Sequence, residues 1–253
     1  MVGALSGDAI TTGINNIAIG RSALSAEVAG DNSIAIGRNT LLAQTNSTNA
    51  DIYNTAVGHA AGTAVTTGIN NTLIGGLVGD ALTTGSENVA LGRSALSSDT
   101  LGAHAVAVGF QALTAQNFTT ATDNYNVAVG YNSGVSITTG IQNTLIGGLA
   151  GDALTDADIN VAVGYGALSS DTLGSKSVAV GKNALFSQNF TTATDSLNTG
   201  VGHNAGAQIT TGIDNTLVGG LAGDALTVGN NNVAMGRSAL TTDTKGDRAV
   251  AIA

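Results

Sequence analysis

The chain has 253 residues, no cysteine and a formal net charge of −9, with 17 acidic residues against eight lysines and arginines. So few basic residues argue against a nucleic-acid or anionic-membrane partner, and no apolar run approaches the length that spans a bilayer. Only 3% of the residues are aromatic, whereas 36 are glycine and none is proline. We therefore expect thin coils filled by Ala, Val, Ile and Leu rather than a conventional aromatic core.

The pentapeptide Asn-x-Ala-x-Gly recurs along the chain and is first legible at residues 16–20. Its glycine returns in steps of 17, 17, 21 and 17 residues, which together form a 72-residue super-repeat. The glycines are Gly3, Gly20, Gly37, Gly58, Gly75, Gly92, Gly109, Gly130, Gly147, Gly164, Gly181, Gly202, Gly219 and Gly236, with Ala253 in register. Such a strict period predicts an all-β parallel solenoid of about fifteen coils, with residues 1–253 as a single repetitive domain.

The three residues before the glycine are predicted to form a strand in each coil, as at 17–19, 34–36, 89–91, 127–129, 161–163 and 178–180. Side chains alternate between the two faces of a strand, so the two branched residues point one way and the middle residue the other. Both faces are apolar. We expect one face to fill the coil and the other to pack against a neighbouring copy of the same chain.

Three further columns accompany the strands. Asparagine stands four residues before most of the glycines, where stacked coils about 4.8 Å apart predict a hydrogen-bonded ladder and Asn also suits a left-handed corner. Leucine four residues after the glycine is predicted to plug the coil, with Leu77, Leu149 and Leu221 taking that role where it is missing. A second strand is expected at the threonine column, Thr11, Thr45, Thr66, Thr83, Thr100, Thr138, Thr155, Thr172, Thr210, Thr227 and Thr244.

Residues 32–37, Asn-Ser-Ile-Ala-Ile-Gly, resemble the head repeats of YadA-like trimeric autotransporter adhesins, and the repeats also look like those of bacteriophage tail fibres. The resemblance covers essentially the whole chain. It implies a left-handed parallel β-roll, a homotrimer, and attachment to a cell-surface receptor or polysaccharide from an extracellular position on a virion or cell. The candidates for the trimer core are Ala18, Ala35, Leu73, Ala90, Ala128, Leu145, Ala162 and Leu217.

Two departures from the family accompany the resemblance. The family coil is usually shorter than the 17-residue coil of this chain, and the chain shows no signal peptide, apolar heptad stalk or membrane-anchoring segment. We therefore expect a fragment or one module of a longer fibre.

The three 21-residue coils contain the segments 44–51, 116–123 and 188–195, which are expected to bulge as loops. Aromatic and amide side chains there could stack on sugars and hydrogen-bond their hydroxyls; alternatively, the aromatics fill the wider coil or pack between subunits. The candidates for receptor or glycan binding are Tyr53, Asn117, Phe118, Tyr125, Asn189 and Phe190. Glycosylation-type sequons begin at Asn46, Asn117 and Asn189, although chance accounts for them in a chain so rich in Asn and Thr.

The residue directly after the glycine is mostly basic or aromatic, which predicts an exposed ridge. No group of nucleophile, base and orienting residue stands out, and the aspartates recur one per coil as turn caps. We expect no enzymatic activity, no cofactor and no metal. Besides an adhesive fibre, two hypotheses stay open: an ice-binding solenoid that uses the threonine column, and a purely structural shaft.

Overall fold

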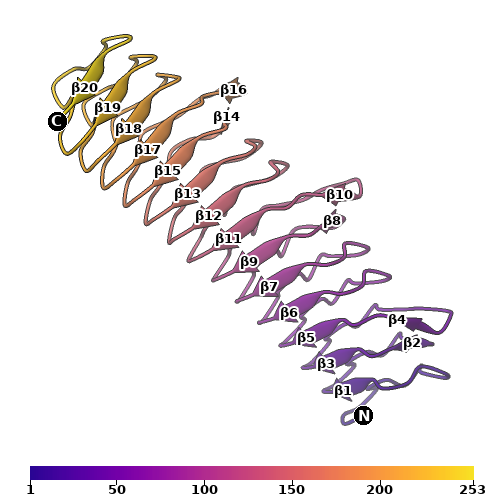
Figure 1. Cartoon of the computed structure of the whole chain (residues 1–253). Helices are drawn as coiled ribbons and strands as arrows, with labels where there is room; N and C mark the ends of the chain where they lie inside the picture. The colour runs from indigo at the N-terminus through magenta and orange to yellow at the C-terminus, as the bar shows by residue number, and fades with distance from the viewer. The chain divides into compact units, whose positions relative to one another are not determined.

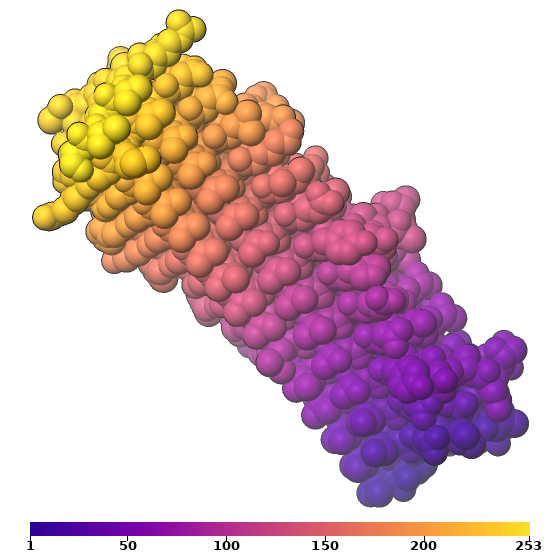
Figure 2. Space-filling model, in the orientation of Figure 1, coloured from indigo at the N-terminus to yellow at the C-terminus, as the bar shows by residue number.

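The computed structural model describes residues 1–253 and contains strands, turns and bends but no helix, and so no helix that could cross a membrane. The chain divides into two compact units, unit 1 (Met1–Tyr125) and unit 2 (Asn126–Ala253). Within each unit short parallel strands stack side by side, one per coil (Figure 1), and the coils form successive bands on the surface (Figure 2). The predicted all-β parallel solenoid is confirmed, with about 14 turns.

In unit 1 the main sheet is parallel and follows chain order. Its strands are β1 (Ile17–Ile19), β3 (Ile34–Ile36), β5 (Thr55–Val57), β6 (Thr72–Ile74), β7 (Val89–Leu91) and β9 (Val106–Val108). Two smaller parallel pairs accompany the long coils, β2 (Gly30–Asp31) with β4 (Ala50–Asp51) and β8 (Gly102–Ala103) with β10 (Thr122–Asp123).

Unit 2 repeats this arrangement. Its main strands are β11 (Val127–Val129), β12 (Thr144–Ile146), β13 (Val161–Val163), β15 (Val178–Val180), β17 (Thr199–Val201), β18 (Thr216–Val218), β19 (Val233–Met235) and β20 (Val250–Ile252). The small pair is β14 (Gly174–Ser175) with β16 (Thr194–Asp195). In both units the strands lie at the positions that the pentapeptide predicts.

The middle residue of each strand points into its own coil, and the two flanking residues point outward. In β1, Ala18 is fully buried, whereas Ile17 and Ile19 are 44% and 41% exposed. The structure therefore corrects the residues assigned to a trimer core, because an atom enclosed by its own coil has no surface left for a partner. All eight of them have 0% exposure in the single chain: Ala18, Ala35, Leu73, Ala90, Ala128, Leu145, Ala162 and Leu217.

The leucine plug is present, but its replacement in other coils is different from the prediction. Leu24 and Leu96, four residues after the glycine, are fully buried, whereas Leu77 is 36% exposed. In the coil of Gly75, Gly79 takes the position of the plug and Leu73 replaces alanine in the middle of the strand. A Cβ added to Gly79 would lie only 2.9 Å from Cδ2 of Leu73. The coil therefore keeps its volume by exchanging Ala and Leu for Leu and Gly.

The asparagine ladder joins each coil to the next. The amide nitrogen of Asn71 donates to Gly85 O at 2.9 Å, and its oxygen accepts from the backbone N–H of Asn88 at 3.0 Å. The ladder is thus built mainly of side-chain to backbone bonds. The left-handed corner lies one residue earlier than predicted, as at Asn70 (φ 59°).

The threonine column does not form a second strand. Thr66 lies in a bend, and its hydroxyl donates to Thr83 O of the next coil at 3.2 Å, while that of Thr83 donates to Thr100 O at 2.9 Å. The corner is instead a turn whose backbone the hydroxyls bridge.

Candidate functional site

The four-residue insertions of the long coils form three protruding loops, 46–51 and 118–123 in unit 1 and 190–195 in unit 2. In unit 1 the loops near β4 and β10 reach further out than those of the coils between them (Figure 1). Most of their residues are exposed, such as Thr119, Thr120 and Asp123. These loops are the largest irregular features of a surface that holds no pocket within either unit.

A buried carboxylate in the preceding coil holds the start of each loop. We call Glu27, Asp99 and Asp171 the carboxylate anchors; all three have 0% exposure. Oδ1 of Asp99 accepts from the backbone N–H of Phe118 at 3.2 Å and of Gly102 at 3.0 Å, while Gln116 donates to Oδ2 at 2.6 Å. Asp171 has the same partners one super-repeat later, Phe190, Gly174 and Gln188.

The anchors differ in how many donors they meet. Burial raises the pKa of Glu27, but hydrogen bonds from Gln44, Gly30 and Asn46 more than offset this, so its pKa lies below the ordinary value. Six donors reach its two oxygens. Burial dominates at Asp99, which has fewer donors, and raises its pKa. A lowered pKa means that folding favours the ionised form of Glu27.

We predict that Glu27→Gln destabilises unit 1 by about 2–4 kcal/mol at pH 7, because one acceptor oxygen becomes an amide that faces the donors of Gln44 and Asn46. The folded pKa is depressed, so the stabilisation is present above the unfolded pKa and is lost as the pH falls through the folded value. Urea unfolding of both proteins at pH 7 and pH 3 should show the difference shrinking in acid. The exposed Asp8→Asn is the control; a difference that persists undiminished in acid contradicts the prediction.

A second contact on the surface holds the end of each loop. In each case an aspartate at the end of the loop contacts a residue of the preceding coil that has a left-handed conformation. The amide of Asn32 donates to Asp51 at 2.5 Å, His104 Nδ1 lies 3.2 Å from Asp123, and the ammonium of Lys176 donates to Asp195 at 2.5 Å. Side chains of three chemical types therefore contact the loop ends.

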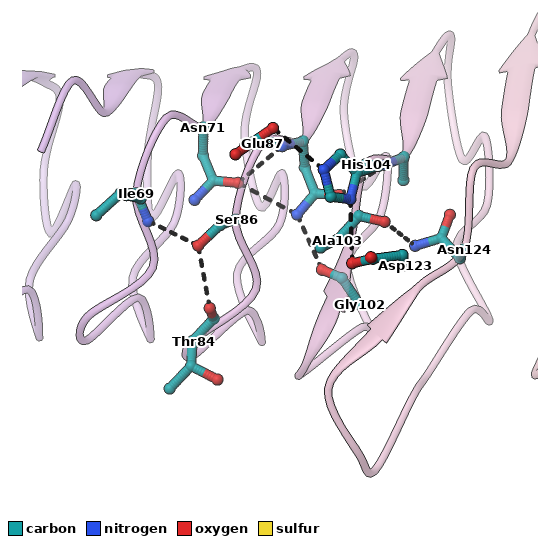
Figure 3. Close-up of polar contacts among 12 residues, drawn as sticks. Ile69, Asn71, Thr84, Ser86, Glu87, Gly102, Ala103, His104, Asp123 and Asn124 are labelled. Atoms are coloured by element: carbon teal, nitrogen blue, oxygen red, sulfur yellow. Dashed lines mark hydrogen bonds and ion pairs between the residues drawn. The ribbon is translucent and has the colours of Figure 1, made fainter.

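The second of these contacts belongs to a larger cluster, with His104 at its centre (Figure 3). Its Nε2 lies 3.1 Å from Oε2 of Glu87, and its ring stacks on Tyr125 with centroids 5.1 Å apart. The buried Nδ1 is within ion-pair distance of Asp123 but makes no aligned hydrogen bond. The cluster joins three coils of unit 1 and forms no metal site.

We predict that His104→Ala loosens loop 118–123, whereas His104→Lys, which copies the third repeat, retains it. Backbone amides of the loop should exchange hydrogen about two- to fivefold faster in the alanine variant, as expected for loss of a surface contact between polar side chains. Both substitutions place a non-glycine residue at the same left-handed position (φ 64°), so their backbone cost is matched. Loop 190–195 is the internal control; equal exchange in both variants argues against the contact.

The residues predicted to bind a receptor fall into two groups in the structure, exposed and buried. Tyr53 and Tyr125 are 55% and 51% exposed, and Asn117 and Asn189 are exposed at the loop starts. Phe118 and Phe190 are only 5% and 6% exposed, so their rings fill the widened coil and offer no face for stacking on a sugar. The alternative interpretation, in which the aromatics fill the coil, holds for these two.

The sequons also differ in their surroundings. The amide nitrogen of Asn46 donates to Oε2 of Glu27 at 2.8 Å, so a glycan there would break an anchor contact. The side chains of Asn117 and Asn189 are exposed and accept from Thr100 and Thr172.

The sequence predicts Asp99 and Asp171 as turn caps, and their bonds from the N–H of Gly102 and Gly174 confirm that role. It missed their contacts with the next coil, the third anchor Glu27 and the His104 cluster. A signal for the anchors existed, because residues 27, 99 and 171 are spaced by the super-repeat and are all acidic. The glycine step places Glu87 and His104 in one column, each five residues before its repeat glycine, but Asp123 lies in an insertion that the step does not place.

The chain matches no protein family, no curated protein and no solved structure.

Proposed function

We propose that the chain is a segment of an adhesive fibre, a homotrimeric left-handed β-roll that attaches to a cell-surface receptor or polysaccharide outside the cell. One observation carries this proposal: the outward face of each main sheet is mostly apolar, with threonine only at the first position of β5, β6, β12, β17 and β18. In unit 1 this face exposes Val89 (40%) and Leu91 (43%) of β7 as well as the isoleucines of β1, and in unit 2 it exposes Ile146 (40%) and Met235 (47%). Soluble monomers rarely leave a continuous apolar face of this kind uncovered.

Identical chains are the simplest cover for this face, because a closed symmetric assembly brings the same apolar rows together. Three chains are the number that the repeat resemblance implies. The protruding loops contain polar and charged side chains, including Asn117 and Asp123, and an assembly built on the sheet faces would leave them available to a receptor. A homotrimer therefore accounts for both the apolar face and the polar loops.

We predict that Leu91→Glu dissociates the assembly, because a carboxylate would be buried at the contact without a partner. Sedimentation velocity should report the mass of one chain for this variant. Val228→Glu is the matched control, since Val228 is 42% exposed but lies in a bend away from the strands, and it should keep the wild-type mass. Dissociation by both variants, or by neither, speaks against the sheet face as the interface.

Two assays separate adhesion from the alternatives. An adhesive segment should bind members of a glycan array, and a purely structural shaft should bind none. Ice binding through the threonine column would be detected as thermal hysteresis. The column offers little regular surface for it, since hydroxyls such as that of Thr83 donate to the next coil.

A further inference from the structure

The residues that directly follow the repeat glycine form an exposed column in which the basic residues of the chain gather. In unit 1 it contains Arg21, Arg38, His59, Gly76 and Arg93, and in unit 2 it includes Lys182, His203 and Arg237. These eight positions hold five of the chain's eight lysines and arginines, and no position of the column is acidic. The chain has 17 acidic residues, so the clustering of its basic residues in one column needs an explanation.

The column of unit 1 stacks in register, coil upon coil. The carbonyl of Arg21 accepts from the N–H of Asn39 at 2.9 Å, that of Arg38 from Ala60 at 2.9 Å, and that of His59 from Leu77 at 2.9 Å. Neighbouring members are therefore one strand spacing apart, about 4.8 Å at the backbone. Like charges at this spacing repel each other when nothing lies between them.

No carboxylate within the chain relieves this repulsion. The ion pairs of the structure involve His104 and Lys176, and none involves Arg21, Arg38 or His59. Arg93 instead lies over the ring of Phe110, 5.9 Å from its centroid. All four basic side chains of the column are exposed. The guanidinium forks are thus available to anionic groups of another molecule.

A notch interrupts the row between His59 and Arg93. Gly76 occupies this position, and a Cβ added to it would meet no atom within 4 Å. On its two sides the row is bordered by the apolar strand ends, such as Ile74, and by small or uncharged residues such as Ser94. The notch leaves room for an uncharged part of a ligand, such as a sugar ring, between the side chains of His59 and Arg93.

We propose that this row, Arg21, Arg38, His59 and Arg93, binds an anionic polysaccharide whose carboxylate or sulfate groups follow the stacked coils. A linear polysaccharide presents charges at intervals of one or two sugars, comparable with one or two coils, and its uncharged rings suit the glycine notch. A duplex nucleic acid is disfavoured, because it carries phosphates along two strands whereas the cations form a single row. The inference rests on the proposed attachment function, to which it adds a ligand class.

The test compares two double variants that each remove two positive charges. R21Q/R38Q neutralises adjacent members of the row, and K245Q/R248Q neutralises two exposed cations outside the column. Isothermal titration calorimetry would measure binding of a dextran sulfate oligosaccharide, with neutral dextran of equal length as control. We expect R21Q/R38Q to weaken binding about tenfold and K245Q/R248Q less than about twofold.

Three outcomes overturn the proposal: wild-type protein that prefers dextran sulfate no more than neutral dextran, equal losses in both variants, or tighter binding of a single-stranded oligonucleotide through the same arginines. Light scattering on the same samples separates this test from that of the fibre. If a monomer binds dextran sulfate, the row is a binding site but the trimer is refuted. If a trimer does not bind dextran sulfate, the binding site is refuted but the trimer is not.

Discussion

Gly75→Ala should destabilise unit 1 by about 3 kcal/mol or more, while Gly76→Ala, one residue later, should change its stability by no more than about 0.5 kcal/mol. Gly75 belongs to the repeat glycine column and has φ 144°, which an L side chain rarely adopts. A Cβ there would lie 2.5 Å from the carbonyl oxygen of Gly92 in the next coil. That oxygen belongs to the backbone of the neighbouring coil and cannot move aside cheaply.

Each variant adds one methyl group to the same turn, at adjacent positions, so the comparison isolates the stacking of the coils. At Gly76 the added methyl enters open space, and no left-handed φ opposes it. Urea unfolding followed by circular dichroism should place the midpoint of Gly75→Ala well below that of Gly76→Ala. Because coils of a solenoid contact only their neighbours, amide exchange should rise most near residues 58–92. Equal midpoints would contradict the close approach of the glycine column.

Asn88→Ala should lower the free energy of unfolding of unit 1 by about 3–5 kcal/mol, the second large effect that we predict. The fully buried amide of Asn88 donates to Gly102 O at 3.0 Å and accepts from the N–H of Ala105 at 2.8 Å. Alanine would leave both backbone groups buried and unpaired, with a cavity beside them.

Asn16→Ala is the matched control for this prediction. Asn16 makes the equivalent bonds, to Gly30 O and from the N–H of Ser33, but it is only half-buried. Water can therefore reach the groups that its removal frees, and the loss should be about half as large. Thermal unfolding of both variants measures the difference. If Asn88→Ala destabilises the protein no more than Asn16→Ala does, the buried ladder contributes little to stability.

Periodicity was enough to predict the fold. The glycine step located each strand, such as β1 and β7, because a solenoid coil repeats both its strand and its corner. It could not decide which face of a strand lies inside, since Ala18 and Ile17 are both apolar and alternation alone is symmetric. In the structure the middle residue, alanine in most strands and leucine at Leu73, lies inside the coil, and the β-branched residue Ile17 lies outside.

The threonine corner and the loops were harder to predict. Threonine is common in strands, which is why Thr83 was assigned to one, but the hydrogen bond of its hydroxyl to the next coil favours a turn. Phe118 looked like a ligand contact because it follows an insertion, yet the wider coil needs filling. The glycine step put Glu87 and His104 in one column, but the end contact of loop 118–123 could not be foreseen, because Asp123 lies in the insertion that the step does not place.

The mass of the wild-type chain in solution, measured by light scattering, tests the central claim most directly. The proposed fibre segment requires the outward sheet faces, with Leu91 43% exposed in the single chain, to be covered by identical chains. We predict a mass of three chains that does not change on dilution through the micromolar range. A stable mass of one chain would contradict the trimeric fibre and show that the apolar sheet face stays open to water.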